Sequence, residues 1–441
     1  MLKSMKQPIL GICLFYLILA SSYAIAVPLW EAPDEPAHFI YADHFARYGQ
    51  PQPRAAWLPG GWLQNVITGY EWYQPPAYYA FSGLILKMNR TLSFLPPFTD
   101  FPTVIATQNR VFAPTIPPIT EPHLLRLFSV LLGLGTVLLV FCLSKRIFSK
   151  EPWLPELTAG FVAFIPQFMF LHAYITNDTL AIFCTTLGIF GLLNSVVLQS
   201  VPERRDWVTA GFASAPAVAV KMTSWFLLPL AAALALINLT KKRRSFVNTI
   251  VHFVFYLLSA LSLFFISWLL WPDLFERLLG SPNATGIRRD FLIPTHFIDL
   301  IPLTHSSFWG RFGWMNLPVP VPLLIPLDSI GLTGLCFGIY ASVRSADSFT
   351  SNQRNAILIF LLSIIFVLIT FLLFNLTTIQ PQGRYFYPAI SSIGFFVAYG
   401  WMALAGKYRK MVVLTILSMM ILINIFVLTT VILPAYAPPL G

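Results

Sequence analysis

Long apolar runs separated by short polar connectors constrain this chain more than any other feature. Of its 441 residues, 56% are hydrophobic and only 10% are charged, whereas a soluble domain carries about a quarter charged residues. A helix needs about 20 mainly apolar residues to cross the hydrocarbon core of a bilayer. We therefore expect an all-α integral membrane protein with about eleven spans. The expected spans are residues 7–29, 123–144, 157–175, 178–198, 207–221, 223–239, 247–271, 321–343, 355–375, 384–405 and 411–433.

The positions of the basic residues predict how these spans are oriented. Lys and Arg collect in cytoplasmic loops, and in this sequence they recur in alternate connectors. We therefore expect a cytoplasmic N-terminus and an extracytoplasmic C-terminus. The net charge of +10 reflects this topology, so no nucleic-acid partner is expected. The basic connectors contain residues 145–150, 204–205, 241–244, 344–354 and 407–410, and Lys3 and Lys6 precede the first span.

We expect residues 1–441 to form a single polytopic membrane domain with two long outer segments. Loops of such length usually carry structure or function of their own. Removal of residues 1–26 by a signal peptidase stays open as an alternative, because Ala24-Ile25-Ala26 resembles a cleavage site. The expected order is a first span at 7–29, an outer segment at 30–121, spans within 123–271, an outer segment at 272–320 and spans within 321–433.

Prolines predict two short interfacial helices in the first outer segment. One is expected over residues 36–48, where Gly49 suits the position after a helix end. The other is expected over residues 74–88, which start with prolines and are too short to be a clear span. Because the residue before a proline avoids the α region, Glu35 is expected to cap the first helix. Asp34 would then lie just outside that helix and point towards a substrate.

Asp34 and Glu35 are the first candidates for catalysis. They are adjacent carboxylates just beyond the first span, and carboxylates act as general bases in enzymes. The alternative is that Glu35 only caps a helix while Asp34 is solvated. His38 and Tyr41 follow on the same helix and are candidates for substrate binding. A metal site made by His38 and the two acids is a weaker alternative, and the need for a divalent cation stays open.

The remaining candidates lie at the expected outer ends of other spans. Charged groups at membrane depth are costly unless they are paired or hydrated, so they mark functional sites by default. An arginine can bind a phosphate with a rigid two-pronged fork. The alternatives are helix capping by the Asn-Asp pair and a snorkelling arginine in an aromatic belt. These candidates for substrate binding are Arg126, Asn177, Asp178, Lys221, Arg384, Tyr385 and Tyr387.

Several of these residues carry a resemblance to a known superfamily. The acidic pair after the first span and the QPPAYY segment at residues 74–79 resemble the GT-C membrane glycosyltransferases. Protein O-mannosyltransferases and the aminoarabinose transferases of lipid A belong to that superfamily. Arg126 and the Asn177-Asp178 pair fit the same resemblance. More narrowly, PDEPAHF at residues 33–39 and QGRYFYP at residues 382–388 are similar to a bacterial polytopic membrane family assigned to GT-C.

The resemblance implies a GT-C-like helical bundle and a sugar transferase. The implied donor is a polyprenyl-phosphate sugar used on the outer face with inversion at the anomeric carbon. Asp34 would be the base with Glu35 beside it, and Arg384 would hold the donor phosphate, with Lys221 and Arg126 as further candidates. The implied acceptor is a cell-envelope glycan, lipid or protein. Because no large soluble domain follows the last span, acceptor recognition is expected in the two outer segments.

Other functions stay open at this point. A transporter or flippase of lipid-linked sugars would need polar groups and Gly or Pro breaks deep in several spans, usually in repeated halves. In this sequence the polar groups concentrate at the outer ends of the spans, and no repeat is visible. An assembly scaffold without activity, and a ligase or polymerase that transfers a whole glycan, are the further alternatives.

Overall fold

The computed structural model describes residues 7–54, 65, 69–107, 109–113, 119–199, 201–240, 245–279, 294–377 and 379–437. Lys3, Lys6 and the basic residues 241–244 lie outside the described residues, so their part in the predicted topology stays a prediction.

The described residues are mainly helical, as the hydropathy pattern predicts. The first half contains α1 Gln7–Ala26, α2 Glu35–Tyr48, η2 Tyr70–Tyr73, α4 Ala77–Leu92, α5 Pro122–Ile147, α6 Leu154–Ala163, α7 Pro166–Leu171, α8 Asn177–Leu192, η3 Leu193–Val197 and α9 Arg204–Val220. The second half contains η4 Met222–Phe226, α10 Leu227–Thr240, α11 Phe246–Ala260, α12 Ser262–Leu270, α13 Leu274–Leu279, α14 Pro294–Trp309, α15 Val321–Arg344, η6 Ala346–Ser348, α16 Ser351–Thr377, η7 Gly383–Ala389, α17 Ile390–Ala405, η8 Gly406–Tyr408, α18 Arg409–Val427, η9 Leu428–Ile432 and α19 Leu433–Tyr436.

The long helices confirm an all-α, multi-pass membrane fold. Within the described residues, 7 helices are long and apolar enough to cross a membrane, or up to 8 if α11 and α12, bent by 41°, form one span. The expected number of about eleven is larger and stays a prediction. One of the 7 is a continuous helical stretch, Gly383–Tyr436, which contains the sharp turn at Gly406 (φ +50°) between α17 and α18.

The expected span at residues 157–175 is broken in the structure. It contains α6, which has 10 residues, and α7, which has 6. Ile165 between them has an extended backbone (ψ 122°), and Pro166 begins α7. A proline suits the first turn of a helix but cannot continue the preceding one. Hydropathy alone does not detect this break, because both pieces are apolar.

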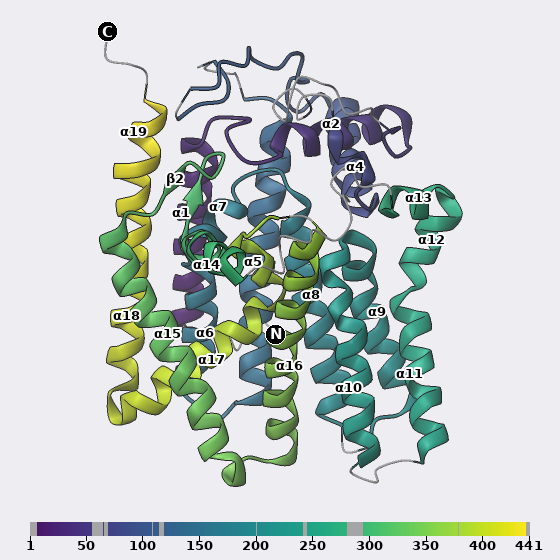
Figure 1. The fold of residues 1–441 in the computed structure, drawn as a ribbon, viewed down its shortest axis with the longest axis vertical. Coiled ribbons are helices and arrows are strands. Elements are labelled where there is room, and N and C mark those ends of the chain that lie inside the picture. The colour runs from purple at the N-terminus through teal and green to yellow at the C-terminus, as the bar shows by residue number, and fades with distance from the viewer. Residues whose placement is uncertain are drawn as a thin grey trace.

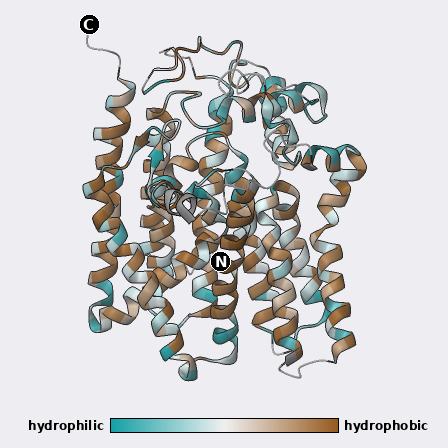
Figure 2. Cartoon of the chain, in the orientation of Figure 1, coloured by the Kyte–Doolittle hydropathy of each residue, from teal (hydrophilic) through white to brown (hydrophobic). Residues whose placement is uncertain are grey.

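The elements of the first outer segment gather at one end of the bundle. Figure 1 shows α2, α4 and α13 at the same end as the last turn of α19. The connections between α15 and α16 and between α17 and α18 lie at the opposite end (Figure 1). Arg344 ends α15 beside the first connection and Lys407 lies in the second, so both basic residues lie at this end of the bundle; the orientation in the membrane stays a prediction. Figure 2 shows hydrophobic residues along the long helices and more hydrophilic ones towards both ends.

Close packing between α15 and α17 fixes the part of the chain that follows η7. A Cβ atom added to Gly338 would lie 1.9 Å from the Phe396 carbonyl oxygen, and one added to Gly400 would lie 2.0 Å from the Gly334 oxygen. Small residues allow membrane helices to approach each other this closely. The contact therefore holds α17, and with it the preceding η7, in a defined position against α15.

A short hairpin crosses the outer end of the bundle. Strands β1 Arg311–Phe312 and β2 Leu317–Pro318 pair antiparallel, with Arg311 opposite Pro318. Its turn contains Trp314, whose Nε1 donates to the Trp30 carbonyl oxygen at 3.1 Å. The hairpin of the second outer segment is thereby attached to the start of the first outer segment.

Candidate active site

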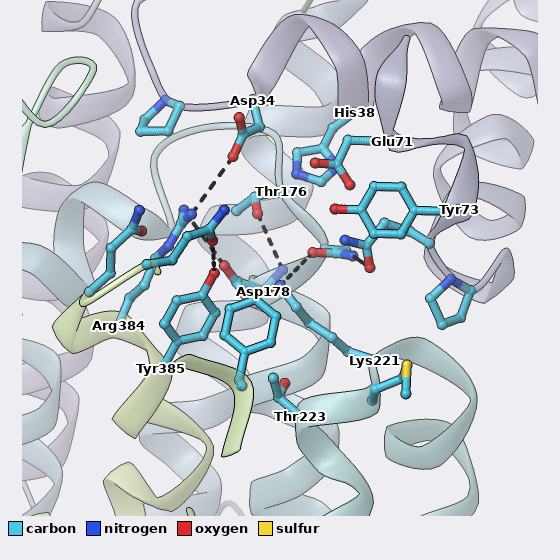
Figure 3. A pocket seen from close by; sticks show the side chains of 18 of the residues that line it. Asp34, His38, Glu71, Tyr73, Thr176, Asp178, Lys221, Thr223, Arg384 and Tyr385 are labelled. Atoms are coloured by element: carbon cyan, nitrogen blue, oxygen red, sulfur yellow. Dashed lines mark hydrogen bonds and ion pairs between the residues drawn. The ribbon is translucent and has the colours of Figure 1, made fainter. Parts of the chain in front are cut away.

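A cavity of about 700 Å³ lies where the outer segments meet the ends of the long helices (Figure 3). Its walls come from the start of α2, from η2, from the start of α8, from η4, from the hairpin turn, and from α16 and η7. Most of the charged and polar candidates therefore reach it from segments far apart in the sequence. Its ionisable side chains and their polar neighbours include Asp34, His38, Glu71, Asn177, Asp178, Lys221, Arg384 and Tyr385.

The backbone at Asp34 turns its side chain into the cavity. Asp34 has left-handed angles (φ 64°, ψ 0°) at the N-cap position of α2, and its side chain makes no capping bond with the described helix. Aspartate tolerates this region better than most residues other than glycine. The expected helix start is corrected by one residue: Glu35 is the first residue of α2, and Asp34 takes the cap position. The avoidance of helix before Pro36 is a preference that tertiary contacts override here.

Asp34 is held by one strong contact and one loose contact. The Tyr70 hydroxyl donates to Oδ1, and Nη2 of Arg384 lies 3.7 Å from Oδ2. The Asp34 side chain is 18% exposed, so the carboxylate is accessible from the cavity. The two residues stand 350 positions apart in the sequence, and the fold brings them over one cavity.

Two cations share the carboxylate of Asp178. Nζ of Lys221 lies 2.5 Å from Oδ1, and Nη1 of Arg384 lies 3.7 Å from Oδ2. Lys221 also donates to Asn177 Oδ1 at 3.0 Å, and Asn177 Nδ2 donates to Gln74 Oε1 at 3.2 Å. Arg384 is thus shared between Asp34 and Asp178, at 3.7 Å from each, and makes no close ion pair with either carboxylate.

Arg384 is positioned by tight contacts of its own segment. The Gly383 amide donates to Ser307 Oγ at 2.8 Å, and a Cβ on Gly383 would lie 2.3 Å from the Phe308 nitrogen. Only glycine therefore allows η7 to lie against α14. Nη1 of Arg384 donates to the Tyr174 hydroxyl at 3.1 Å, and its Nε has no hydrogen-bond partner among the described residues.

A protein-family model described as "Predicted membrane protein (DUF2142)" matches residues 122–393 of this chain. The chain belongs to this family. The matched range holds three of the cavity's charged residues, Asp178, Lys221 and Arg384, whereas Asp34 precedes it. No curated protein matches the chain.

Solved structures show the fold to which this DUF2142 protein is similar. ArnT from Cupriavidus metallidurans bound to undecaprenyl phosphate matches with a TM-score of 0.51 and 13% identity, over 96% of this chain and 73% of ArnT. The oligosaccharyltransferase AglB from Archaeoglobus fulgidus, in complex with an inhibitory peptide and a dolichol-phosphate, matches with a TM-score of 0.50 and 12% identity. That match covers 95% of this chain and 55% of AglB, so this chain spans about half of that protein. These matches confirm the expected GT-C-like fold.

Two of the predicted site residues lie outside the cavity of the DUF2142 protein. Glu35 and Arg126 form a two-pronged ion pair, with 2.7 Å from Nε to Oε1 and 2.7 Å from Nη2 to Oε2. The Arg126 side chain is 2% exposed and that of Glu35 is 0% exposed. Arg126 also donates to the carbonyl oxygens of residues 24, 27 and 28, and Glu35 accepts from the amides of Trp30 and Ile175. This geometry ties α1, α2, α5 and the start of α8 together, and suits a structural role.

Two predicted tyrosines also point away from the cavity. Tyr41 stacks on Tyr79, with ring centroids 3.8 Å apart, and so packs α2 against α4. The Tyr387 hydroxyl donates to the Phe308 carbonyl oxygen at 2.7 Å and supports η7 from below the site. Tyr385, by contrast, lines the cavity, and its hydroxyl donates to Gln380 Oε1 at 2.5 Å.

His38 lines the cavity as a neutral side chain. It is buried, and Nδ1 lies 2.8 Å from the Tyr79 hydroxyl. Burial, with smaller effects from Lys221 and Arg384, lowers the pKa of His38 to about 3, although Asp178 opposes the shift. The described part of the chain contains no group of three or more His, Cys, Asp or Glu side chains that could hold a metal ion. Among the described residues that line the cavity, Lys221 and Arg384 carry the positive charges.

Glu71 is a cavity residue that the sequence does not single out. It lies in η2 and is 4% exposed, and burial together with Asp34 raises its pKa to about 7. In the sequence it is one of many acids in the outer segments. The nearby QPPAYY segment was the only available signal, since it places an aromatic and proline-rich turn next to this acid.

Proposed function

We propose that this protein transfers a sugar from a polyprenyl-phosphate donor to a hydroxyl group of a cell-envelope glycan, lipid or protein. The transfer takes place on the extracytoplasmic face of a bacterial inner membrane. One observation carries the proposal: the Asp34 carboxylate and the Arg384 guanidinium lie 3.7 Å apart over a single cavity at the outer end of the bundle. A base and a phosphate-binding cation are the two groups that such a transfer requires.

The reaction can be written with these residues in defined roles. Asp34 accepts the proton of the acceptor hydroxyl group while the oxygen of that hydroxyl group bonds to the anomeric carbon. The bond between that carbon and the phosphate oxygen breaks, and its electron pair leaves with the lipid phosphate. Arg384 and Lys221 stabilise the charge that develops on this phosphate. A single displacement inverts the anomeric carbon, and the proton remains on Asp34 until it passes to solvent.

The apolar side of the cavity supports a lipid donor. Thr370, Leu373 and Phe374 of α16 line it together with Met222 of η4. Leu373 is 60% exposed and Met222 is 48% exposed, so this wall continues onto the outer surface of the helices. A polyprenyl chain would leave between α16 and η4 while its phosphate stays on the two cations. The bound undecaprenyl phosphate of ArnT and the dolichol-phosphate of AglB support the same class of donor.

The test is consumption of the donor by membranes that contain the protein. Membranes from the native host supply the acceptor, and synthetic undecaprenyl-phosphate hexoses supply the sugar. Wild-type membranes are expected to consume at least one of these donors and release undecaprenyl phosphate, whereas Asp34→Asn membranes with the same amount of protein do not. Equal consumption in both would exclude Asp34 as the base. Movement of the lipid across the bilayer without consumption would favour a flippase instead.

A further inference from the structure

Glu71 has an unusual position for a carboxyl group that makes no ion pair within the described residues. Its residue is 4% exposed and lines the cavity, and its Oε2 atom has no hydrogen-bond partner in the part of the chain that the structure describes. A buried polar atom without a partner costs free energy, so native proteins keep few of them. Such an atom on a cavity wall is available to a ligand.

The short turn that carries Glu71 is fixed on both sides. Gly69, with φ +78°, leads into η2, and its carbonyl oxygen accepts from Gln52 Nε2 at 3.0 Å. At the other end, the buried guanidinium of Arg277 donates to the carbonyl oxygens of Trp72 at 3.0 Å and Gln52 at 2.6 Å. Two separate segments, those of Gln52 and Arg277, therefore hold η2, and Glu71 is presented to the cavity by a defined backbone. Figure 3 shows its carboxyl group directed into the cavity.

The groups around Glu71 come from α2, η2 and the start of η4. Burial and the Asp34 carboxylate raise the pKa of Glu71 to about 7, while Lys221, Gln74 and Tyr70 act in the opposite direction. Near neutral pH a carboxyl group in this state can accept a hydrogen bond through one oxygen and donate one through the other. This combination suits neighbouring hydroxyl groups better than a cation or a phosphate.

The place of Glu71 relative to the cations points to the donor sugar. In the proposed function the lipid phosphate lies on Lys221 and Arg384, and the sugar is attached directly to this phosphate. Lys221 is the cation that faces Glu71. Tyr73 and Trp314 also line this cavity and offer flat apolar faces to it, and Tyr73 lies in the same turn as Glu71. Binding pockets commonly combine such faces with a few polar groups that fix the orientation of the ligand.

We propose that Glu71 binds a hydroxyl group of the sugar on the lipid donor and thereby selects which sugar is used. This inference rests on the proposed function and extends it from the lipid phosphate to the sugar. It makes Glu71 a specificity-determining residue, distinct from the base Asp34 and from the phosphate-binding Arg384.

The experiment compares binding of bare undecaprenyl phosphate with binding of the same lipid carrying glucose, galactose or mannose. The purified full-length protein is expected to bind at least one sugar-bearing lipid about tenfold more tightly than the bare lipid, as one hydrogen bond to a carboxyl group allows. Glu71→Ala should abolish this preference and leave the affinity for the bare lipid within about twofold. Glu71→Gln should keep part of the preference, since an amide also donates and accepts.

Thermal unfolding of the same variants separates binding from folding. Glu71 Oε2 has no partner among the described residues, but the carboxyl group has side-chain hydrogen bonds with Gln74 and Tyr70. Glu71→Gln can keep these bonds and should melt no lower than the wild type, whereas Glu71→Ala loses them and should melt slightly lower. Glu31→Gln is the matched control: Glu31 is a buried acid of the same outer segment whose Oε1 accepts from the amides of Val111 at 3.1 Å and Phe112 at 2.9 Å. It should lower the melting temperature and leave the sugar preference unchanged. If Glu71→Ala does not fold, the sugar preference measured for Glu71→Gln tests the inference.

Two outcomes would overturn the inference. In one, the Glu71 variants keep the full sugar preference; in the other, the wild type binds sugar-bearing and bare lipid equally. In both cases the lipid-phosphate part of the proposed function would remain supported if the wild type binds undecaprenyl phosphate and Arg384→Ala does not. Absence of any binding of undecaprenyl phosphate to the wild type would instead remove the proposed function itself, and this inference with it.

Discussion

Asp34 and Glu35 are neighbours in the chain with almost the same chemistry, yet the fold gives them opposite surroundings. Both oxygens of Glu35 lie 2.7 Å from nitrogens of Arg126, and backbone amides complete its hydrogen bonds. Asp34 meets its arginine only at 3.7 Å and faces a cavity. A carboxylate that is fully satisfied inside the protein has no capacity left for a substrate, whereas a loosely held one does. The comparison supports a structural role for Glu35 and is the reason for proposing Asp34 as the base.

The largest effect is expected from Asp34→Asn. The amide has the same shape but cannot take a proton from the acceptor, so turnover of the lipid donor should fall by about 10²–10⁴-fold. The measurement is release of undecaprenyl phosphate at saturating donor by native-host membranes, which supply the acceptor and contain the same amount of each variant. Asp43→Asn is the control on the same helix: Asp43 pairs with Arg47 at 2.8 Å and with Arg90 at 2.5 Å, away from the cavity. Turnover by Asp34→Asn close to that of Asp43→Asn would reverse the assignment.

Arg126→Met tests the structural role of the ion pair between Glu35 and Arg126. This change leaves the Glu35 carboxylate buried without its partner, and breaking a buried pair in this way costs about 3–5 kcal/mol. The protein should melt at a clearly lower temperature in detergent, and donor affinity per folded molecule should change little. Adding Glu35→Gln to Arg126→Met should recover part of the loss, because no buried charge then remains. A single variant as stable as the wild type would contradict the structural role of the pair.

A smaller effect is expected at the cationic side of the cavity. Arg384→Ala removes one of the two cations proposed to hold the donor phosphate, so affinity for undecaprenyl phosphate should fall about 10- to 100-fold. Lys221 remains, but its Nζ lies 2.5 Å from Asp178 and is partly neutralised by it. Arg110→Ala is a suitable control, since Arg110 packs over the Tyr436 ring outside the cavity. Equal affinities in the two variants would remove Arg384 from the phosphate site.

The sequence predicts the membrane class and the meeting of Asp34 with Arg384, for physical reasons. Apolar runs of 20 residues are costly in water, so hydropathy alone identifies most of the spans. Asp34 and Arg384 each stand beside a proline or glycine at the mouth of a span, in the segments PDEPAHF and QGRYFYP, where the chain must leave the helix. The resemblance of these two segments to GT-C proteins supplied the expectation that they share one site.

The sequence could not distinguish Glu35 from Asp34, or Glu71 from the other outer acids. Glu35 is satisfied by Arg126, 91 residues further along, and no local pattern encodes that contact. The left-handed backbone that turns Asp34 into the cavity depends on the packing around α2 as well as on residue type. Glu71 is buried because η2 is held by Gln52 and Arg277. These features arise from tertiary structure, which a reading of spacing and composition does not contain.

The smallest effect is expected at Glu71, the third acid in this comparison. It is buried like Glu35, but it makes no ion pair within the described residues. Its pKa is raised from 4.5 to about 7 in the folded protein. The unfolded chain therefore loses this proton at lower pH than the folded protein, and the stability linked to protonated Glu71 is lost as pH rises through about 7. His38, with its pKa lowered to about 3, has the opposite sign: its contribution is complete above its ordinary value of 6.5 and is lost as pH falls.

The two contributions partly cancel in the wild type, so the melting temperature must be compared between variants. Subtracting the wild-type curve from that of Glu71→Gln removes the His38 contribution, which is common to both. The difference should grow in favour of Glu71→Gln as pH rises from 4.5 to about 7 and then level off. A difference that does not change with pH would mean that Glu71 ionises as freely as an exposed acid. Glu71 would then be hydrated or paired, and it would not be an acid held ready for a ligand on the cavity wall.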